Sequence, residues 1–272
     1  MKLKGILNTL TSFAVASLLF ACSSVDEDNR FIEIETPVAP GDSTTNIITK
    51  NVLIEDFTGQ MCQNCPLAGK VIEELHGTYN DSTLIPVAIY SGKPGMCIPV
   101  GKKGSLTTDE GQEYFETWGL NNQPIGLVNR NGGPLDKSVW PAKVFEFSQQ
   151  EAPLAMDVKT KLSADGKTIN VHLVVTPVKS VSGKLQLWVT EDNIVGIQKM
   201  PDGKPVKDYV HNHVFRTSVN GTWGEAAQFT ENAVFEKEYV VNVAEDWNAE
   251  NIHIVAFVYN DVDGVLQVTR SF

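Results

Sequence analysis

Hydrophobic positions in residues 47–151 alternate between short apolar runs and helical stripes. The runs that predict buried strands are Val52–Phe57, Leu84–Tyr90 and Ile125–Asn129. A stripe at helical spacing follows the first run and is made by Leu67, Val71, Ile72 and Leu75. Thr107 and Glu110 have the spacing of a capping box before a second helix, and Val139–Gln150 predicts a third. This order predicts an α/β layer of parallel strands with helices on both faces.

The pattern changes in residues 152–272, where strand-like runs follow one another without intervening helices. Asp165-Gly166, Asp202-Gly203 and Asp263-Gly264 mark turns between the runs. The seven expected strands are Met156–Leu162, Thr168–Pro177, Lys184–Thr190, Tyr209–Thr217, Ala233–Val243, Ile252–Tyr259 and Val265–Arg270. Serial strands of this length favour an all-β, immunoglobulin-like sandwich. We therefore expect two domains, one over residues 47–151 and one over residues 152–272.

The N-terminus has the order of a secretory signal. Lys2 and Lys4 precede the apolar stretch Ile6–Phe20, and Cys22 follows it. The segment Leu19 to Cys22 resembles a bacterial lipobox, which implies that residues 1–21 are a signal peptide and that Cys22 is lipidated. Residues 22–46 then read as a polar tether. Its acidic cluster Asp26-Glu27-Asp28 resembles a surface-export signal of some Gram-negative lipoproteins, and a plain solvated linker is the other interpretation.

The charge balance narrows the range of partners. The chain has 272 residues, of which 42% are hydrophobic, with 22 Lys and Arg against 33 Asp and Glu. The net charge of −11 argues against nucleic-acid binding, which needs a basic face for phosphates. Acyl chains on Cys22 would attach the protein to membrane lipid without a membrane-spanning segment. We expect no cofactor.

Cys62 and Cys65 carry the clearest chemistry in the sequence. They lie between the first strand and the first helix, where free N–H groups and the helix dipole favour a thiolate. Cys62 would be the exposed nucleophile, and Cys65, one turn later, would resolve a mixed disulfide. A static disulfide of an exported protein is the alternative. A single Cys pair without a second pair or a nearby His is weak support for zinc.

The surroundings of this motif resemble those of thioredoxin-like domains. Asp56 lies six residues before Cys62, and Gln123-Pro124 precedes the third strand, where that family has its cis-proline. The resemblance implies that Asp56 takes the proton of Cys65 and that Pro124 shapes a groove for an extended substrate. Met61 stands where the family usually has Trp, and an insertion spans residues 92–105.

Two further features stay open between a functional and a structural interpretation. Lipidation of Cys22 leaves three thiols, so Cys97 in the insertion would be unpaired. Cys97 is either a third, resolving thiol at the active edge or an inert buried side chain. His211 and His213 would project to one side of a strand and are weak candidates for a metal site, because the sequence shows no third ligand.

The whole mature chain resembles the 28-kilodalton outer-membrane-protein family of lipoproteins from Gram-negative anaerobes. The matching pieces are Cys22, the run from Glu55 to Pro66, the strand from Gln123 to Arg130, and the segment from His211 to Arg216. The resemblance implies an outer-membrane lipoprotein, on the periplasmic or the cell-surface face. Two functions follow as hypotheses: disulfide binding or exchange with extended polypeptides, or adhesion and ligand binding with Cys62–Cys65 as a brace.

Overall fold

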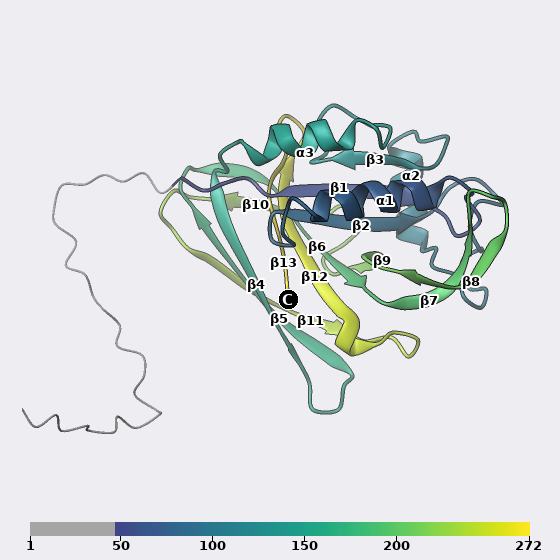
Figure 1. Ribbon diagram of the computed structural model, residues 1–272. Coiled ribbons are helices and arrows are strands. Elements are labelled where there is room, and N and C mark those ends of the chain that lie inside the picture. Colours follow the sequence, from purple (N-terminus) through teal and green to yellow (C-terminus); the bar gives the residue numbers. More distant parts are fainter. Residues whose placement is uncertain (1–46) are drawn as a thin grey trace, which may run out of the picture. The chain divides into compact units, whose positions relative to one another are not determined.

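The computed structural model describes residues 47–272 (Figure 1). The predicted signal segment, Cys22 and the tether lie outside the described residues. Within residues 47–272 no helix is both long and apolar enough to cross a bilayer. The fold is mostly β-sheet, arranged in three separate sheets.

The first part of the chain contains three strands and three helices in alternation. They are β1 (Val52–Thr58), α1 (Cys65–His76), β2 (Leu84–Tyr90), α2 (Asp109–Thr117), β3 (Ile125–Val128) and α3 (Trp140–Ser148). β1 and β2 are parallel, as expected, whereas β3 runs antiparallel to β1. The expectation of an all-parallel layer is therefore wrong for β3.

Both faces of β1 are buried, because alternate side chains enter different cores. Val52 and Ile54 pack with α1 and α3, and Leu53 and Phe57 pack with α2. Within α1 the buried face is made by Cys65, Pro66, Ala68, Ile72 and Leu75. Leu67, expected on that face, is 36% exposed. The N-cap of α2 is Thr108, whose hydroxyl accepts from the Gly111 N–H, and not Thr107.

The second part contains ten strands rather than seven. They are β4 (Leu154–Leu162), β5 (Thr168–Pro177), β6 (Val181–Glu191), β7 (Ile194–Lys199), β8 (Pro205–His211), β9 (Val214–Ser218), β10 (Glu225–Phe229), β11 (Phe235–Asn242), β12 (Ile252–Asn260) and β13 (Gly264–Arg270). A short 3-10 turn, Ala249–Asn251, precedes β12. The sequence patterns missed β7 and β10. The expected strand over residues 209–217 is wrong, because positive φ at His213 divides it into β8 and β9.

The largest sheet joins strands from both parts of the chain. Its order is β13-β12-β6-β9-β2-β1-β3, with β10 paired to β6. The sheet crosses from one part to the other between β2 and β9, where Ala88 pairs with Val214. The three-stranded sheet β11-β5-β4 shares an apolar core with β6 and β12, and β7 and β8 form a hairpin of their own. The domain boundary at residue 151 stays a prediction. The largest sheet contains strands from both sides of that boundary.

Candidate functional site

The two motif cysteines are joined where β1 leads into α1. Cys62 and Cys65 form a disulfide with their Cα atoms 5.4 Å apart, and Cys65 is the first residue of α1. Pro66 occupies the first turn, where its missing N–H leaves no helical hydrogen bond unmade. The pair therefore lies at the positive end of a helix, the location that favours a thiolate after reduction.

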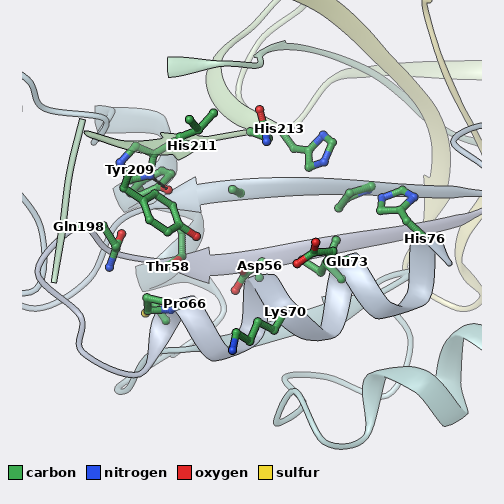
Figure 2. A pocket seen from close by; sticks show the side chains of 18 of the residues that line it. Asp56, Thr58, Pro66, Lys70, Glu73, His76, Gln198, Tyr209, His211 and His213 are labelled. Carbon is green, nitrogen blue, oxygen red and sulfur yellow. Dashed lines mark hydrogen bonds between the residues drawn. The ribbon is translucent and has the colours of Figure 1, made fainter. Parts of the chain in front are cut away.

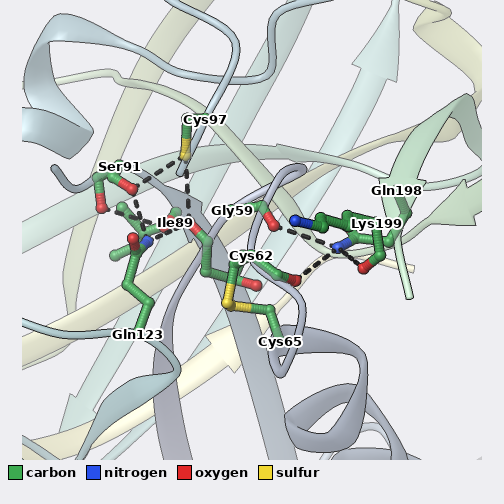
Figure 3. The surroundings of a disulfide bond; sticks show 10 residues. Gly59, Cys62, Cys65, Ile89, Ser91, Cys97, Gln123, Gln198 and Lys199 are labelled. Atoms are coloured by element: carbon green, nitrogen blue, oxygen red, sulfur yellow. Dashed lines mark hydrogen bonds between the residues drawn. A yellow bond between two sulfur atoms is a disulfide. The ribbon is translucent and has the colours of Figure 1, made fainter. Parts of the chain in front are cut away.

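Both sulfur-bearing residues are buried, which corrects the expectation that Cys62 is exposed. Cys62 is 1% exposed and Cys65 is 3% exposed. Two segments lie against the motif loop, residues 59–62: the insertion 92–105 on one side and the β7–β8 hairpin on the other (Figure 3). The sequence patterns did not predict that either segment would lie against the motif loop.

The insertion approaches the motif loop through Gly59. The Met61 N–H donates to the Met96 carbonyl at 2.9 Å. A Cβ atom at Gly59 would lie 2.3 Å from the Met96 oxygen and 2.9 Å from the Cys97 sulfur. Only a residue without a side chain fits between β1 and this loop, so Gly59 has a packing role beyond ending the strand.

The hairpin is attached to the motif loop by hydrogen bonds. Gln198 Nε2 donates to the carbonyl oxygens of Gly59 and Cys62, at 3.2 Å each (Figure 3). The Lys199 N–H donates to the Gln60 carbonyl at 2.8 Å. Gln63 Nε2 donates to the Pro201 carbonyl at 2.6 Å. Three carbonyl groups of the motif loop are thus satisfied by one short segment of the hairpin.

Asp56 lines a cavity of about 600 Å³ beside α1 (Figure 2). The cavity is lined by α1, β1, β2 and the hairpin, and Cys65, Tyr209 and His211 contribute to its wall. Asp56 is 4% exposed, and its Oδ1 has no hydrogen-bond partner among the described residues. Burial raises the pKa of the Asp56 carboxyl to about 7, so it exchanges a proton near neutrality.

His211 and His213 both line this cavity, but they do not share one strand as expected, because β8 ends at His211 and β9 begins at Val214. His211 is 1% exposed and its Nδ1 is hydrogen-bonded to the Tyr90 hydroxyl at 2.6 Å. Burial lowers the pKa of the His211 imidazole to about 4. His213 lies in the break between the two strands, and its Nδ1 lies 3.3 Å from Asp192. Within residues 47–272 no group of three or more His, Cys, Asp or Glu side chains is arranged for a metal ion.

Cys97 and Pro124 lie near the carboxyl ends of β1 and β2. Cys97 forms no disulfide within residues 47–272, and its thiol donates to the Ser91 carbonyl at 3.0 Å. Burial raises the pKa of this thiol, so it is protonated at neutral pH. The Gln123–Pro124 bond is cis, and the Gln123 amide donates to the carbonyls of Thr58 and Ser91. Pro124 itself is buried, so it does not line an open groove in this form.

No curated protein matches the chain, whereas a number of solved structures do. HBP35 of Porphyromonas gingivalis matches with a TM-score of 0.64 and 15% identity, over 82% of this chain and 75% of that one. This similarity shows a shared fold. Protein AGR_C_4864 of Agrobacterium tumefaciens matches at TM-score 0.49 and 13% identity, over 82% and 94% of the two chains.

The family of the chain follows from its second part. A domain of the outer membrane lipoprotein Omp28 from P. gingivalis is 25% identical over 44% of this chain and 86% of that one, at TM-score 0.31. The family model of the outer membrane protein Omp28 matches residues 111–272, more than half of the chain. That match begins after the cysteine motif and includes Arg130 and the β7–β8 hairpin. The chain belongs to the outer membrane protein Omp28 family.

Proposed function

We propose that this protein is an outer-membrane lipoprotein, anchored through Cys22, whose Cys62–Cys65 pair exchanges disulfides with thiols of extended polypeptide partners. A thioredoxin-like arrangement of the first part supports this proposal. The pair lies between β1 and α1, β2 is parallel to β1, and a proline precedes the antiparallel strand β3. A likeness of fold does not imply activity, so the proposal rests on the site.

The observation that carries the proposal is Asp56. A buried carboxyl group whose Oδ1 is unpartnered lowers stability. A disulfide that only braces a loop has no use for such a group. A disulfide that opens and closes does, because each cycle moves a proton to or from the buried sulfur of Cys65. Asp56 and Cys65 line the same cavity, and the raised pKa of Asp56 suits that proton transfer.

The proposed exchange takes place between the Cys62–Cys65 disulfide and two thiols of the partner. A partner thiolate attacks the Cys62 sulfur, a new S–S bond forms to Cys62, and the Cys62–Cys65 bond breaks. The sulfur of Cys65 leaves as a thiolate and takes the proton of the Asp56 carboxyl group. A second partner thiolate then attacks the mixed disulfide and releases Cys62. The partner's two thiols are oxidised to a disulfide while the pair is reduced, and the reverse sequence reduces a partner disulfide.

The test is the reduction potential of the pair in the mature lipoprotein. An exchanging pair is expected between about −270 and −120 mV, whereas a structural disulfide lies below about −300 mV. Cys65→Ser should also accumulate a mixed disulfide at Cys62 with a peptide that carries an intramolecular disulfide, because the Cys62 thiolate breaks that bond and one peptide sulfur leaves as a thiolate. Cys62→Ser should not. A potential below about −300 mV, together with no mixed disulfide, would refute exchange.

The alternative is a non-catalytic adhesion or ligand-binding lipoprotein that uses the disulfide as a brace. The near-complete burial of Cys62 and Cys65 favours this alternative. The same potential measurement decides between the two functions. The role of Cys97 as a third thiol would appear as a longer-lived mixed disulfide in Cys97→Ala.

Anchoring through Cys22 has a separate test. Cys22→Ser removes the acyl acceptor, so the variant should be released in soluble form or stay unprocessed. Fractionation of cells expressing both proteins measures this, and protease accessibility on intact cells distinguishes the periplasmic from the cell-surface face. An unchanged amount of Cys22→Ser in the outer membrane would exclude the lipid anchor.

A further inference from the structure

The carbonyl groups of the motif loop converge on the hairpin. Gly59 and Cys62 both accept from the single Gln198 Nε2, and Gln60 accepts from the Lys199 N–H. Gln198 is itself only 3% exposed. The Gln60 carbonyl accepts from the hairpin backbone, as it would from the N–H of any extended chain that replaced it. Here the ligand is a segment of the same molecule, Gln198–Pro201, which we term the cover segment.

The hairpin that carries the cover segment is held by few contacts of its own strands. β7 and β8 pair with each other and form a two-stranded sheet, a unit that has little stability alone. Val195 and Val210 lie opposite each other on it and are 65% and 47% exposed. The cavity of about 600 Å³ lies between the hairpin and α1, in the place where a packed apolar core would otherwise attach it.

The hairpin is better attached at its base, where β7 begins and β8 ends, than at the cover segment. At the base His211 is buried against Tyr90, and Ile194 packs beside Tyr90, Leu106 and Val214. The cover segment, at the other end, contacts the motif loop through hydrogen bonds that a competing chain could replace. The hairpin therefore has one firm end and one end whose contacts can be exchanged.

We propose that the cover segment occupies the place beside the motif loop where an extended, cysteine-bearing polypeptide docks, and that it must leave before that partner reaches Cys62. The identity of the partner as a cysteine-bearing polypeptide rests on the proposed exchange function. Burial of Cys62 then describes a closed form rather than an inactive site. Partners that can supply backbone N–H groups to Gly59, Gln60 and Cys62 would be selected over small thiols.

The first experiment compares Gln198→Met with wild type in the mature lipoprotein. Met keeps the approximate volume of Gln but has no donor, so two hydrogen bonds to the motif loop are lost. Reduction by tris(2-carboxyethyl)phosphine is irreversible, and its rate reports access to the sulfur atoms whatever the potential of the pair. We expect Gln198→Met to be reduced about tenfold faster than wild type. The matched control is Gln228→Met, on exposed β10.

The second experiment follows the cover segment itself. A 12-residue peptide whose single Cys is activated as a disulfide with thionitrobenzoate is trapped on Cys62 in Cys65→Ser/Cys97→Ala: the Cys62 thiolate attacks the peptide sulfur and thionitrobenzoate leaves. Hydrogen exchange is measured with and without the attached peptide. Residues 198–201 should lose protection when the peptide is attached, while β1 keeps its protection. Unchanged protection of residues 198–201 overturns displacement even if Gln198→Met folds poorly.

The outcomes separate this inference from the proposed function. If wild type and Gln198→Met are reduced by the phosphine at rates within twofold of each other, the cover segment does not shield the disulfide and the inference is overturned. The other case is a faster phosphine rate in Gln198→Met together with a dithiol peptide that reacts with neither wild type nor Gln198→Met. That result supports shielding by the cover segment, but it overturns exchange and the partner docking that depends on exchange. Faster reaction of Gln198→Met with both reagents supports both.

Discussion

At the residue scale, the most deeply buried charges lie on β1 and immediately after β3. Arg130 donates from Nε and Nη2 to the two carboxylate oxygens of Glu55, at 2.7 and 3.1 Å. Their side chains are 2% and 0% exposed. The guanidinium also lies over the rings of Tyr259 and Phe257, at 4.5 and 5.0 Å. The ion pair thus links the first part of the chain to the β12 strand of the second.

Breaking this pair should cost far more than replacing it. Arg130→Met leaves the Glu55 carboxylate buried without its partner, and we expect a loss of about 3–5 kcal/mol in the free energy of unfolding. Glu55→Leu/Arg130→Met removes both charges and should recover most of that loss. Denaturant unfolding of the three proteins measures it. A double variant as unstable as Arg130→Met would show that the charges themselves are required.

Asp56 and His211 line one cavity and oppose each other in their effect on stability. Between about pH 4 and pH 6.5 the unfolded chain holds Asp56 ionised and His211 protonated. The native protein keeps both neutral, because burial raises the pKa of Asp56 to about 7 and lowers that of His211 to about 4. With rising pH, Asp56 therefore lowers the stability by about 1.4 kcal/mol per pH unit, and His211 raises it by the same amount.

Single substitutions should expose the two slopes that cancel in wild type. Relative to wild type, Asp56→Asn should gain stability as the pH rises from about 4 to 6.5, by about 3 kcal/mol in total. His211→Asn should lose a similar amount over the same interval. Denaturant unfolding at half-unit pH steps, with the disulfide intact, measures both. His172→Asn, at an exposed position, is the control. Parallel pH profiles for all four proteins would contradict the buried neutral pair.

At the scale of elements, dense apolar runs were predicted well and half-polar ones were not. The bounds of β2 and β5 agree with their predicted runs to the residue. β7 and β10 were missed, because each is short and carries polar or small residues that local patterns cannot tell from a loop. Glu110 illustrates a further limit: instead of capping its own helix, its carboxylate accepts from the Thr217 hydroxyl and the Ser218 N–H of β9.

The insertion next to the motif offers a test at this scale. Gly59→Ala would place a methyl group 2.3 Å from the Met96 oxygen, so the loop has to move away. We expect alkylation of Cys97 to become about tenfold faster. Gly69→Ala is the matched control, since its Cβ would lie at an ordinary 3.7 Å from the Tyr209 hydroxyl. Equal labelling rates in Gly59→Ala and wild type would contradict this packing role.

At the scale of the whole molecule, the sequence predicted where the cysteine motif lies in the order of elements but not what surrounds it. Asp56 is in β1, Cys65 begins α1 and Pro124 directly precedes β3, so local patterns suffice to place them. The cover segment lies more than 130 residues after the motif loop in the sequence. Gln198 is 139 residues from Gly59 and 136 residues from Cys62, the two residues whose carbonyls it contacts. Contacts at that separation leave no periodicity in either segment, which is why burial of Cys62 was not foreseen.

The apolar core on the α2 side of β1 decides whether the first part folds alone. Leu53, Phe57 and Tyr114 belong to the same buried cluster as Trp188, Phe215 and Phe257 from the second part. A fragment of residues 47–151 would expose those side chains to water and leave β2 as an unpaired edge on the β9 side.

We therefore expect residues 47–151 to lack a cooperative unfolding transition and to bind a hydrophobic dye, with the pair oxidised or reduced. The residues 47–272 should unfold cooperatively under the same conditions. Circular dichroism during urea denaturation measures both proteins, and the predicted boundary gives the alternative result. If the fragment unfolds cooperatively with a slope proportionate to its size, the two parts are separate domains, and the cluster shared with Trp188 is an interface between them rather than a common core.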